Sequence, residues 1–481
     1  MPSAQRPDEP SDPVGAAVRA AIVPLLLLLR RDAAAGRLGV AVALSGGRDS
    51  VVLLDALAAL AVELPVAVSA LHVHHGLSPN ADAWAAFCAA ECARRSIALT
   101  VHRARVARAP GESLEAAARA ARYAAFAAAD ADVVALAHHA DDQAETLLLQ
   151  LLRGAGPHGL AAMPVRREGG APEILRPLLA LPRAVLERHA ARRGLAWIDD
   201  ESNADTGIRR NYLRHEIAPR LAAAFPGYPA ALARSSAHCA EAARLLDELA
   251  ALDAEGIVGP GEQADRDLAE PATLDRAALT ALAGRSPARA RNLLRWYLRQ
   301  QGLVPPSTAR LAAMLGQLAH AAPDARVRLA HDGVEIGIHR GRIALHAPAV
   351  APFALAWAGE CALALPHGML EFAPAVGTGL AAGTLAASPV TVRLREGGER
   401  LRLEAGRSPR PLKRLLHDAG IPPWQREALP LVWCGNALAA VPGIGVDAAF
   451  RATAGAAGLV LRWHPAPVRP VARPSGDHRK D

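Results

Sequence analysis

Apolar runs alternate with helical patterns over the first 152 residues, and this order restricts the possible folds more than any other feature of the sequence. Strands are predicted at 39–44, 66–73, 97–101 and 133–137, and helices at 51–61, 82–93, 114–129 and 144–152. A crossover between parallel strands needs a dozen or more residues and usually contains a helix. The order therefore predicts an α/β fold with a doubly wound parallel sheet and helices on both of its faces.

The pattern changes further along the chain, as expected for 481 residues, which exceed the usual size of one domain. Helical patterns rich in Ala, Leu and Arg occupy 228–251 and 274–318, and short alternating runs after 327 indicate antiparallel strands. A Gly- and Pro-rich stretch extends to about 388. Strands at 390–395 and 431–440 around a helix at 412–419 then predict a small mixed α/β domain.

The net charge favours a polyanionic partner. The chain has 54 Lys and Arg residues against 47 Asp and Glu, giving a formal charge of +7 and a pI near 9.6. Counterion release on contact of arginine with phosphate would supply affinity for RNA. Many basic proteins bind no polyanion, so the charge alone leaves an RNA partner open.

The cysteines indicate a reducing compartment. Five of them, an odd number, occur without the spacing of a disulfide scaffold or a zinc ribbon. Cys88 and Cys92 would share a helix face, but two thiols alone make a poor metal site, and small buried residues are the simpler interpretation. We expect reduced thiols and a cytoplasmic protein.

The amino-terminal region does not resemble a membrane anchor or a signal peptide. Its apolar run, 20–29, contains Pro24 and has half of the roughly 20 residues that a membrane helix needs. Asp8, Glu9 and Asp12 argue against the basic start of a signal peptide. We expect no membrane partner.

The strongest local signal is Ser45-Gly46-Gly47-Arg48-Asp49-Ser50, between the first predicted strand and the first predicted helix. Two glycines permit a tight turn that brings backbone N–H groups close to an anion, and the helix N-terminus adds a favourable dipole. No Gly-Lys-Ser/Thr ending follows, so the segment is not a Walker P-loop. It suits a phosphate or pyrophosphate, although a Gly- and Ser-rich turn can also be purely structural.

Two charged clusters follow. Asp142 and Glu145 are three residues apart, so on a helix they share a face that could hold a metal ion or an ammonium group, or simply favour the helix dipole. Arg210 and Arg214 are four apart and could clamp phosphates, or form a solvated face. Because Mg²⁺ prefers oxygen ligands, His72, His138 and His139 are interpreted as structural or nucleotide-contacting groups.

In their order along the chain, these motifs resemble the tRNA(Ile)-lysidine synthase family, whose catalytic domain is of the PP-loop (N-type ATP pyrophosphatase) type. The resemblance rests on the motifs at 45–50, 138–146, 153–156, 176–179 and 199–211, and on carboxyl-terminal motifs at 395–400, 412–415, 421–424 and 441–445. It is strong over 39–220, weak in the helical middle and clear over 390–446. One departure is Ser78, where the family pattern leads us to expect arginine.

The resemblance implies a division of the chain into parts. These are a tail and helix (1–36), a PP-loop catalytic domain with a parallel doubly wound sheet (37–220), a helical substrate-binding domain (221–325), short strands and a linker (326–388), a small mixed α/β tRNA-binding domain (389–463) and a disordered tail (464–481).

The resemblance also implies an ATP-dependent carbon–nitrogen ligase. In the family, ATP adenylates the C2 oxygen of the wobble cytidine (position 34) in the CAU anticodon of tRNA(Ile). Free L-lysine then attacks C2 and replaces the activated oxygen, giving lysidine, AMP and pyrophosphate. ATP and Mg²⁺ are the expected cofactors, and tRNA(Ile) and L-lysine the expected partners. A homodimer is left open.

Roles carry over to the matching positions. The catalytic set is Asp49, Asp142, Glu145 and Arg210, and Asp49 is also the expected Mg²⁺ ligand. The ATP-binding set is Ser45, Gly46, Gly47, Arg48, Asp49, Ser50, His72 and His139. Phosphate or tRNA contacts are expected at Arg153, Arg214, Lys413 and Arg414. Which carboxylates bind Mg²⁺ and which bind lysine stays open.

Two alternatives differ in chemistry. A PP-loop tRNA thiolase would share the ATP site, but such enzymes typically rely on cysteine pairs, and no Cys-x-x-Cys occurs here. A nonenzymatic RNA-binding protein on a degenerate scaffold would not need the intact Ser45 to Ser50 motif or the acidic clusters that follow it.

Overall fold

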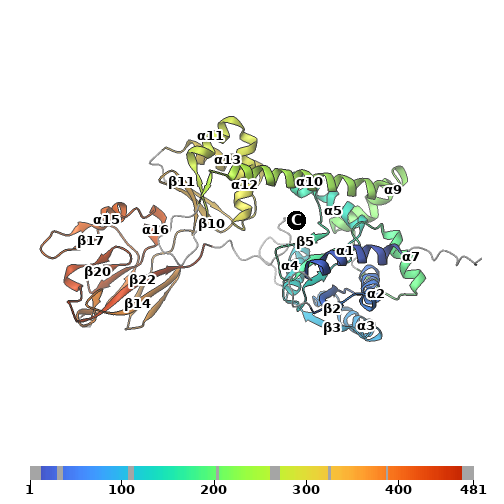
Figure 1. Cartoon of the computed structure of the whole chain (residues 1–481), viewed down its shortest axis with the longest axis horizontal. Helices are drawn as coiled ribbons and strands as arrows, with labels where there is room; N and C mark the ends of the chain where they lie inside the picture. The colour runs from blue at the N-terminus through green and yellow to red at the C-terminus, as the bar shows by residue number, and fades with distance from the viewer. Residues whose placement is uncertain are drawn as a thin grey trace, which may run out of the picture. The chain divides into compact units, whose positions relative to one another are not determined.

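The computed structural model describes residues 12–29, 36–106, 113–201, 205–259, 271–322, 327–385 and 388–468. The described residues up to Leu246 form one compact unit and those from Asp247 form another, and each unit is described by itself (Figure 1). The helix α10 (Tyr228–Ala254) contains the boundary between them.

The first unit is built on a six-stranded sheet in the order β3-β2-β1-β4-β6-β5. The strands are β1 (Leu38–Ala43), β2 (Val66–His74), β3 (Ala98–Arg103), β4 (Val133–Ala135), β5 (Arg166–Arg167) and β6 (Glu173–Leu175). Every pairing is parallel except that of β5 with β6. The chain moves outward from β1 to β3 and then crosses back to β4, so the order of the strands reverses between β1 and β4.

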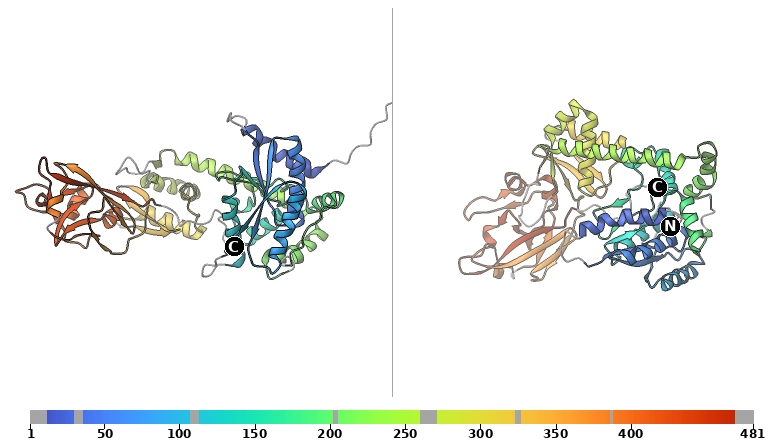
Figure 2. Two further views of the ribbon diagram at one scale, coloured as in Figure 1. Left: turned by 90° about the horizontal axis from the view of Figure 1, so that it is seen from below. Right: turned by 45° about the vertical axis from the view of Figure 1, so that its right-hand side comes forward.

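Helices cover both faces of this sheet (Figure 2). They include α1 (Pro13–Leu29), α2 (Arg48–Glu63), α3 (Ala81–Arg94), α4 (Leu114–Ala127), α5 (Ala140–Leu152) and α7 (Arg183–Arg193). Val40 and Val42 pack with α1, α2, α3 and α7, whereas Ala41 packs on the opposite face with α4. This alternation follows from the two-residue period of a strand and confirms the predicted doubly wound parallel sheet.

The two neighbouring cysteines and the amino-terminal apolar run both lie in the core of this unit. Cys88 and Cys92 are buried in the core between α3 and the sheet, as the simpler interpretation required. The apolar run with Pro24 forms the end of α1, whose Val14, Val18 and Ile22 pack into the same core. Among the residues that the structure describes, no helix has the length and apolar character needed to cross a membrane.

The first unit also contains four short helical segments and the start of α10. They are α6 (Pro157–Leu160), α8 (Arg209–Tyr212), the π-helix η2 (Leu213–Ile217) and α9 (Ala218–Ala224). The π-helix follows α8 directly, so the chain that carries Arg210 and Arg214 changes its hydrogen-bond pattern between them.

The second unit begins with a helical layer on a small sheet. Helices α11 (Arg276–Arg285), α12 (Pro287–Gln300) and α13 (Thr308–His320) share a core with the antiparallel strands β7 (Val258–Gly259), β8 (Thr273–Asp275), β9 (Arg328–His331), β10 (Val334–His339) and β11 (Arg342–His346). The sequence predicted most of this helical content and the strands after 327.

Two further sheets follow. One has the order β12-β16-β19-β20-β21 and the other β13-β14-β22-β15. Their strands are β12 (Ala354–Trp357), β13 (Ala362–Leu365), β14 (Gly368–Val376), β15 (Leu380–Ala381), β16 (Val390–Arg393), β19 (Leu431–Cys434), β20 (Ala437–Val441), β21 (Gly445–Val446) and β22 (Ala457–Pro465). The two-stranded pair β17 (Arg400–Leu401) and β18 (Arg410–Pro411) and the helices α14 (Ala382–Leu385), α15 (Leu412–Asp418) and α16 (Pro423–Ala428) complete the region.

This arrangement differs from the predicted linker before 388. The stretch 354–381 contributes four strands, and β12 and β14 pair with β16 and β22, which come much later in the chain. Strand β22 also extends to Pro465, into the segment predicted as a tail, while 469–481 lies outside the described residues.

Candidate active site

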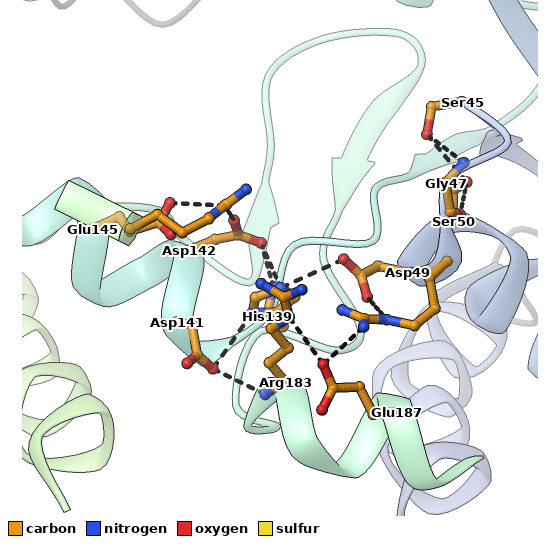
Figure 3. A network of polar contacts seen from close by, with 12 residues as sticks. Ser45, Gly47, Asp49, Ser50, His139, Asp141, Asp142, Glu145, Arg183 and Glu187 are labelled. Atoms are coloured by element: carbon orange, nitrogen blue, oxygen red, sulfur yellow. Dashed lines mark hydrogen bonds and ion pairs between the residues drawn. The ribbon is translucent and has the colours of Figure 1, made fainter. Parts of the chain in front are cut away.

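The predicted site residues of the first unit gather at the carboxyl ends of β1 and β4. The Ser45 to Ser50 loop follows β1, and His139 to Glu145 follow β4, its neighbour in the sheet. The strand order reverses between these two strands, and ligands of open α/β sheets bind at such a point, outside the carboxyl ends of the strands. Figure 3 shows side chains from both segments directed toward one another.

The loop leaves the N-terminus of α2 available to an anion. Gly47 is the N-cap and has no side chain to cap the first turn, and its own N–H donates to the Ser45 hydroxyl at 3.3 Å. The Ser50 hydroxyl instead donates to the Gly47 carbonyl at 2.7 Å, and the Ser45 hydroxyl lies 3.2 Å from that of Ser50. Unpaired N–H groups and the helix dipole together favour phosphate binding at such an end.

Gly46 gives the loop its turn. Its φ is +90°, where residues with a side chain are strained, and a Cβ there would lie 2.9 Å from Ile198 Cδ1 and 3.3 Å from Cys88 Sγ. The Gly46 carbonyl also accepts a hydrogen bond from Ile198 N at 2.9 Å. The loop is therefore packed against the chain behind it, and only glycine fits.

His139 connects the loop to α5. Its Nε2 lies 3.5 Å from an oxygen of Asp49 and 3.5 Å from one of Asp142, and its Nδ1 lies 3.6 Å from Asp141. Burial opposes the charged imidazolium, but the carboxylates of Asp141, Asp49 and Asp142 outweigh it and raise the pKa of His139 to about 10. At neutral pH, His139 is therefore a cation held among three anions.

Asp49 is the loop's carboxylate. Burial works against its ionised form, but hydrogen bonding and attraction from His139, followed by the charge of Arg48, lower its pKa below the usual range. Its side chain remains 32% accessible. Asp49 is thus an ionised oxygen donor that still reaches solvent, which suits a hard cation.

Asp142 and Glu145 do share a face of α5, and both arginines of the second cluster meet them there. Arg210 Nε donates to Glu145 at 2.7 Å and Nη2 to Asp142 at 3.1 Å. Arg214 makes the same pair of contacts at 2.7 and 3.2 Å. Burial disfavours the Asp142 carboxylate, yet Arg210 and then His139 hold its pKa far below the usual range. Two carboxylates and two guanidinium groups thus form a cluster whose formal charges cancel.

The other predicted residues have less direct positions. His72 is buried, with Nδ1 2.8 Å from the Leu44 carbonyl, and burial lowers its pKa, so it supports the strand end beneath the loop as a neutral ring. Arg153 is exposed at the end of α5. Lys413 and Arg414 are exposed on α15, in the second unit. Ser78, where arginine was expected, donates to Glu201 at 2.8 Å.

Two residues of the site were not predicted. Arg183 and Glu187 lie on α7, where the Arg183 backbone N–H donates to Asp141 at 2.9 Å and Glu187 accepts from Arg48 at 2.7 Å. Their four-residue spacing is a recognisable helical ion pair, but nothing in it indicates contact with a loop more than 130 residues earlier.

The described side chains of this site do not by themselves form a complete set of metal ligands. Among the described residues, no group of three or more His, Cys, Asp or Glu side chains is arranged to hold one. Mg²⁺ commonly binds one or two carboxylates and completes its shell with water and substrate phosphates. Asp49, beside an anion-binding helix end, fits that mode of binding.

Comparison with known proteins agrees with these features. Residues 27–221 match the family model of a PP-loop domain, 278–344 that of a TilS substrate binding domain, and 390–463 that of a TilS substrate C-terminal domain. A tRNA(Ile)-lysidine synthase of Nitrosomonas europaea is 43% identical over 439 residues, covering 90% of this chain and 93% of the relative. One of Coxiella burnetii is 39% identical, covering 85% and 90%.

Solved structures are more distant. The U34-tRNA thiolase NcsA from Methanococcus maripaludis, with its [4Fe-4S] cluster, is 17% identical with a TM-score of 0.38, covering 47% of this chain and 78% of that one. A TILS C-terminal domain is 22% identical with a TM-score of 0.21, covering 24% of this chain and 98% of that one.

Proposed function

The chain belongs to the tRNA(Ile)-lysidine synthase family, and on that premise we propose that it ligates free lysine to C2 of the wobble cytidine in the CAU anticodon of tRNA(Ile). The reaction uses ATP, passes through an adenylated cytidine and yields lysidine, AMP and pyrophosphate. Since ATP, lysine and tRNA meet in the cytoplasm, we propose that compartment for it. One observation carries the proposal: an anion-binding helix end and an acidic cluster lie at neighbouring strand ends, joined through His139.

The loop suits the triphosphate of ATP. The first turn of α2 offers backbone N–H groups that no side chain caps, and Ser50 adds a hydroxyl. Asp49 would hold Mg²⁺, which when bound neutralises phosphate charge and so favours the departure of pyrophosphate. The positive end of the helix also stabilises charge that develops on the leaving group.

The acidic cluster suits the ammonium groups of lysine. Asp142 and Glu145 are held on one buried face of α5, and both are already balanced by Arg210 and Arg214. An incoming ammonium group adds a positive charge to a neutral cluster, and the phosphates of ATP add negative charge nearby. We therefore propose that one of the two guanidinium groups turns to the phosphates when both substrates are bound.

This exchange also bears on how lysine loses a proton. An amine must be neutral to attack, so a base is required. With Arg210 beside it, Asp142 has a lowered pKa, so it stays ionised but accepts a proton poorly. Withdrawal of a guanidinium group would raise that pKa and make the carboxylate a better base.

The tRNA would bind through basic side chains outside this cluster. The family matches in the second unit are to a substrate binding domain and a substrate C-terminal domain, and the charge of +7 supports an RNA partner. Arg153, Lys413 and Arg414 are exposed and are proposed to contact RNA phosphates. Such contacts position a nucleic acid without reading its bases.

Thiolation has no comparable support. Cys88, the thiol beside the loop, is fully buried, and burial raises its pKa to about 12. A thiol in that state is a poor nucleophile.

Incorporation of radiolabelled lysine into unmodified tRNA(Ile) with a CAU anticodon tests the proposal. We expect labelling that requires ATP and Mg²⁺, and none of a methionine tRNA that has the same anticodon. ATP–pyrophosphate exchange without lysine labelling would retain the PP-loop chemistry and assign the enzyme to another tRNA modification.

A further inference from the structure

Polar contacts form a closed ring that includes part of the phosphate-binding loop (Figure 3). The ring joins the loop, the start of α5 and the first turns of α7. In order, its contacts are Arg48 Nε to Asp49 at 3.1 Å, Asp49 to His139 Nε2 at 3.5 Å, His139 Nδ1 to Asp141 at 3.6 Å, Asp141 to Arg183 N at 2.9 Å, Arg183 Nε to Glu187 at 3.1 Å, and Glu187 to Arg48 Nη1 at 2.7 Å.

Within this ring, Asp49 has two cationic neighbours. Arg48 contacts one of its carboxylate oxygens and His139 the other. A cation that is to bind Asp49 must compete with both, because each neighbour already offsets the carboxylate's charge. The His139 contact is backed by Asp141 and Asp142, which anchor the imidazolium from behind.

Arg48 is shared between two carboxylates. Its guanidinium reaches Asp49 through Nε and Glu187 through Nη1, and its side chain is only 14% accessible. The contact with Glu187 is the shorter of the two, at 2.7 Å against 3.1 Å. Glu187 is 47% accessible and lies on α7.

We propose that Glu187 is a positioning residue for the nucleotide. It holds the Arg48 guanidinium on the α7 side, so that the adjoining oxygen of Asp49 can be given up to Mg²⁺ when Mg²⁺-ATP binds. Without the charge of Glu187, Arg48 pairs with Asp49 alone and competes with the metal. The inference rests on the proposed ATP site but not on the identity of the acceptor.

Equilibrium binding of α,β-methylene-ATP, measured by calorimetry with Mg²⁺ and again with EDTA, tests this role. Glu187→Gln keeps the side-chain shape and removes the charge. We expect the dissociation constant with Mg²⁺ to rise by about fivefold, the upper range for a partly exposed ion pair. The constant in EDTA should stay the same, because no metal then competes with Arg48.

A second substitution separates positioning from a general effect on folding. Arg48→Met removes the competing guanidinium and keeps an aliphatic side chain of similar length. It also keeps the backbone N–H at the start of α2, through which Arg48 would contact phosphate. In the Glu187→Gln background it should restore the Mg²⁺-dependent affinity to that of the unaltered protein or better. Alone, it should lower the Mg²⁺ concentration needed for half-maximal binding.

The matched control is Glu63→Gln. Glu63 pairs with Arg19 near the other end of α2, and both side chains are exposed, so nucleotide affinity should not change. The proposal is overturned if Glu187→Gln binds the Mg²⁺ nucleotide normally, if Arg48→Met fails to rescue it, or if Arg48→Met alone weakens binding. Because binding is measured without tRNA or lysine, failure of lysidine formation would not be mistaken for failure of this role.

Discussion

Asp55 on α2 is expected to contribute a large part of the local stability behind the phosphate-binding loop. Its side chain is 10% accessible and lies 3.0 Å from Arg193 Nε, 3.4 Å from Arg95 Nη2 and 3.5 Å from His189 Nε2. Burial opposes the carboxylate, but His189, Arg193 and then Arg95 outweigh it and lower the pKa from 3.8 to about 2.

This pKa shift sets the size of the expected effect. A difference of roughly 1.8 units, at about 1.4 kcal/mol per unit, corresponds to about 2.5 kcal/mol of stability at pH 7. Asp55→Asn keeps the shape and removes the charge. Because the folded-state pKa is depressed, the contribution is complete above the unfolded pKa near 4 and disappears as pH falls toward 2.

Hydrogen exchange measured by mass spectrometry is the appropriate assay, since a protein with two units need not unfold in one step. Peptides from β1 and α2 should exchange about 70-fold faster in Asp55→Asn, by the same conversion. The difference should shrink as the pH falls from about 4 toward 2. Asp82→Asn, which breaks exposed contacts with His74 and Arg103, is the control and should exchange normally.

A loss below about threefold in Asp55→Asn would refute the reasoning, because the carboxylate would then contribute no more than an exposed ion pair. A difference that persisted undiminished at pH 2 would refute it too, since Asp55 is then no longer fully ionised.

Two further substitutions test the site. Gly46→Ala should abolish ATP–pyrophosphate exchange, because alanine is strained at a φ of +90° and its Cβ would contact Ile198. The control is Gly194→Ala, at a φ of +61° with open space around it, which should only lower the unfolding midpoint. Normal exchange by Gly46→Ala would contradict the assigned role of the loop. Glu145→Gln should raise KM for lysine more than tenfold. Removing one anion from this buried cluster weakens its binding of the lysine ammonium group by several kcal/mol. Steady-state kinetics at saturating ATP measures this, and an unchanged KM would exclude Glu145 from binding lysine.

The sequence predicted the core of the first unit because local periodicity and burial agree there. The alternation of Val40, Ala41 and Val42 between two cores is the period that identified the strand. The beginnings of α2 and α5 were placed too late, since apolar spacing marks only the buried face. Helix α2 begins at Arg48, after Gly47, and α5 begins at Ala140, where Asp142 accepts a hydrogen bond from the His139 backbone N–H at 3.0 Å.

What the sequence did not predict depends on partners far away in the chain. Strand β14 has Pro374 near its end and lacks a clear alternating pattern. Nothing in its own sequence indicates that it pairs with β22, which begins at Ala457. The same holds within the site. The spacing predicted that Asp142 and Glu145 share one face of a helix. It did not predict their ion pairs with Arg210, which lies 65 residues beyond Glu145.

Cys88 lies directly beneath the phosphate-binding loop, yet its surroundings insulate it from oxidation. Oxidants attack the thiolate, and this thiol is fully buried, with its pKa raised to about 12 and its sulfur 3.8 Å from the Leu44 carbonyl. Cys361, which is exposed, belongs to the second unit. Mild peroxide would therefore modify Cys361 before Cys88, and nucleotide binding should withstand oxidative stress that marks the protein elsewhere.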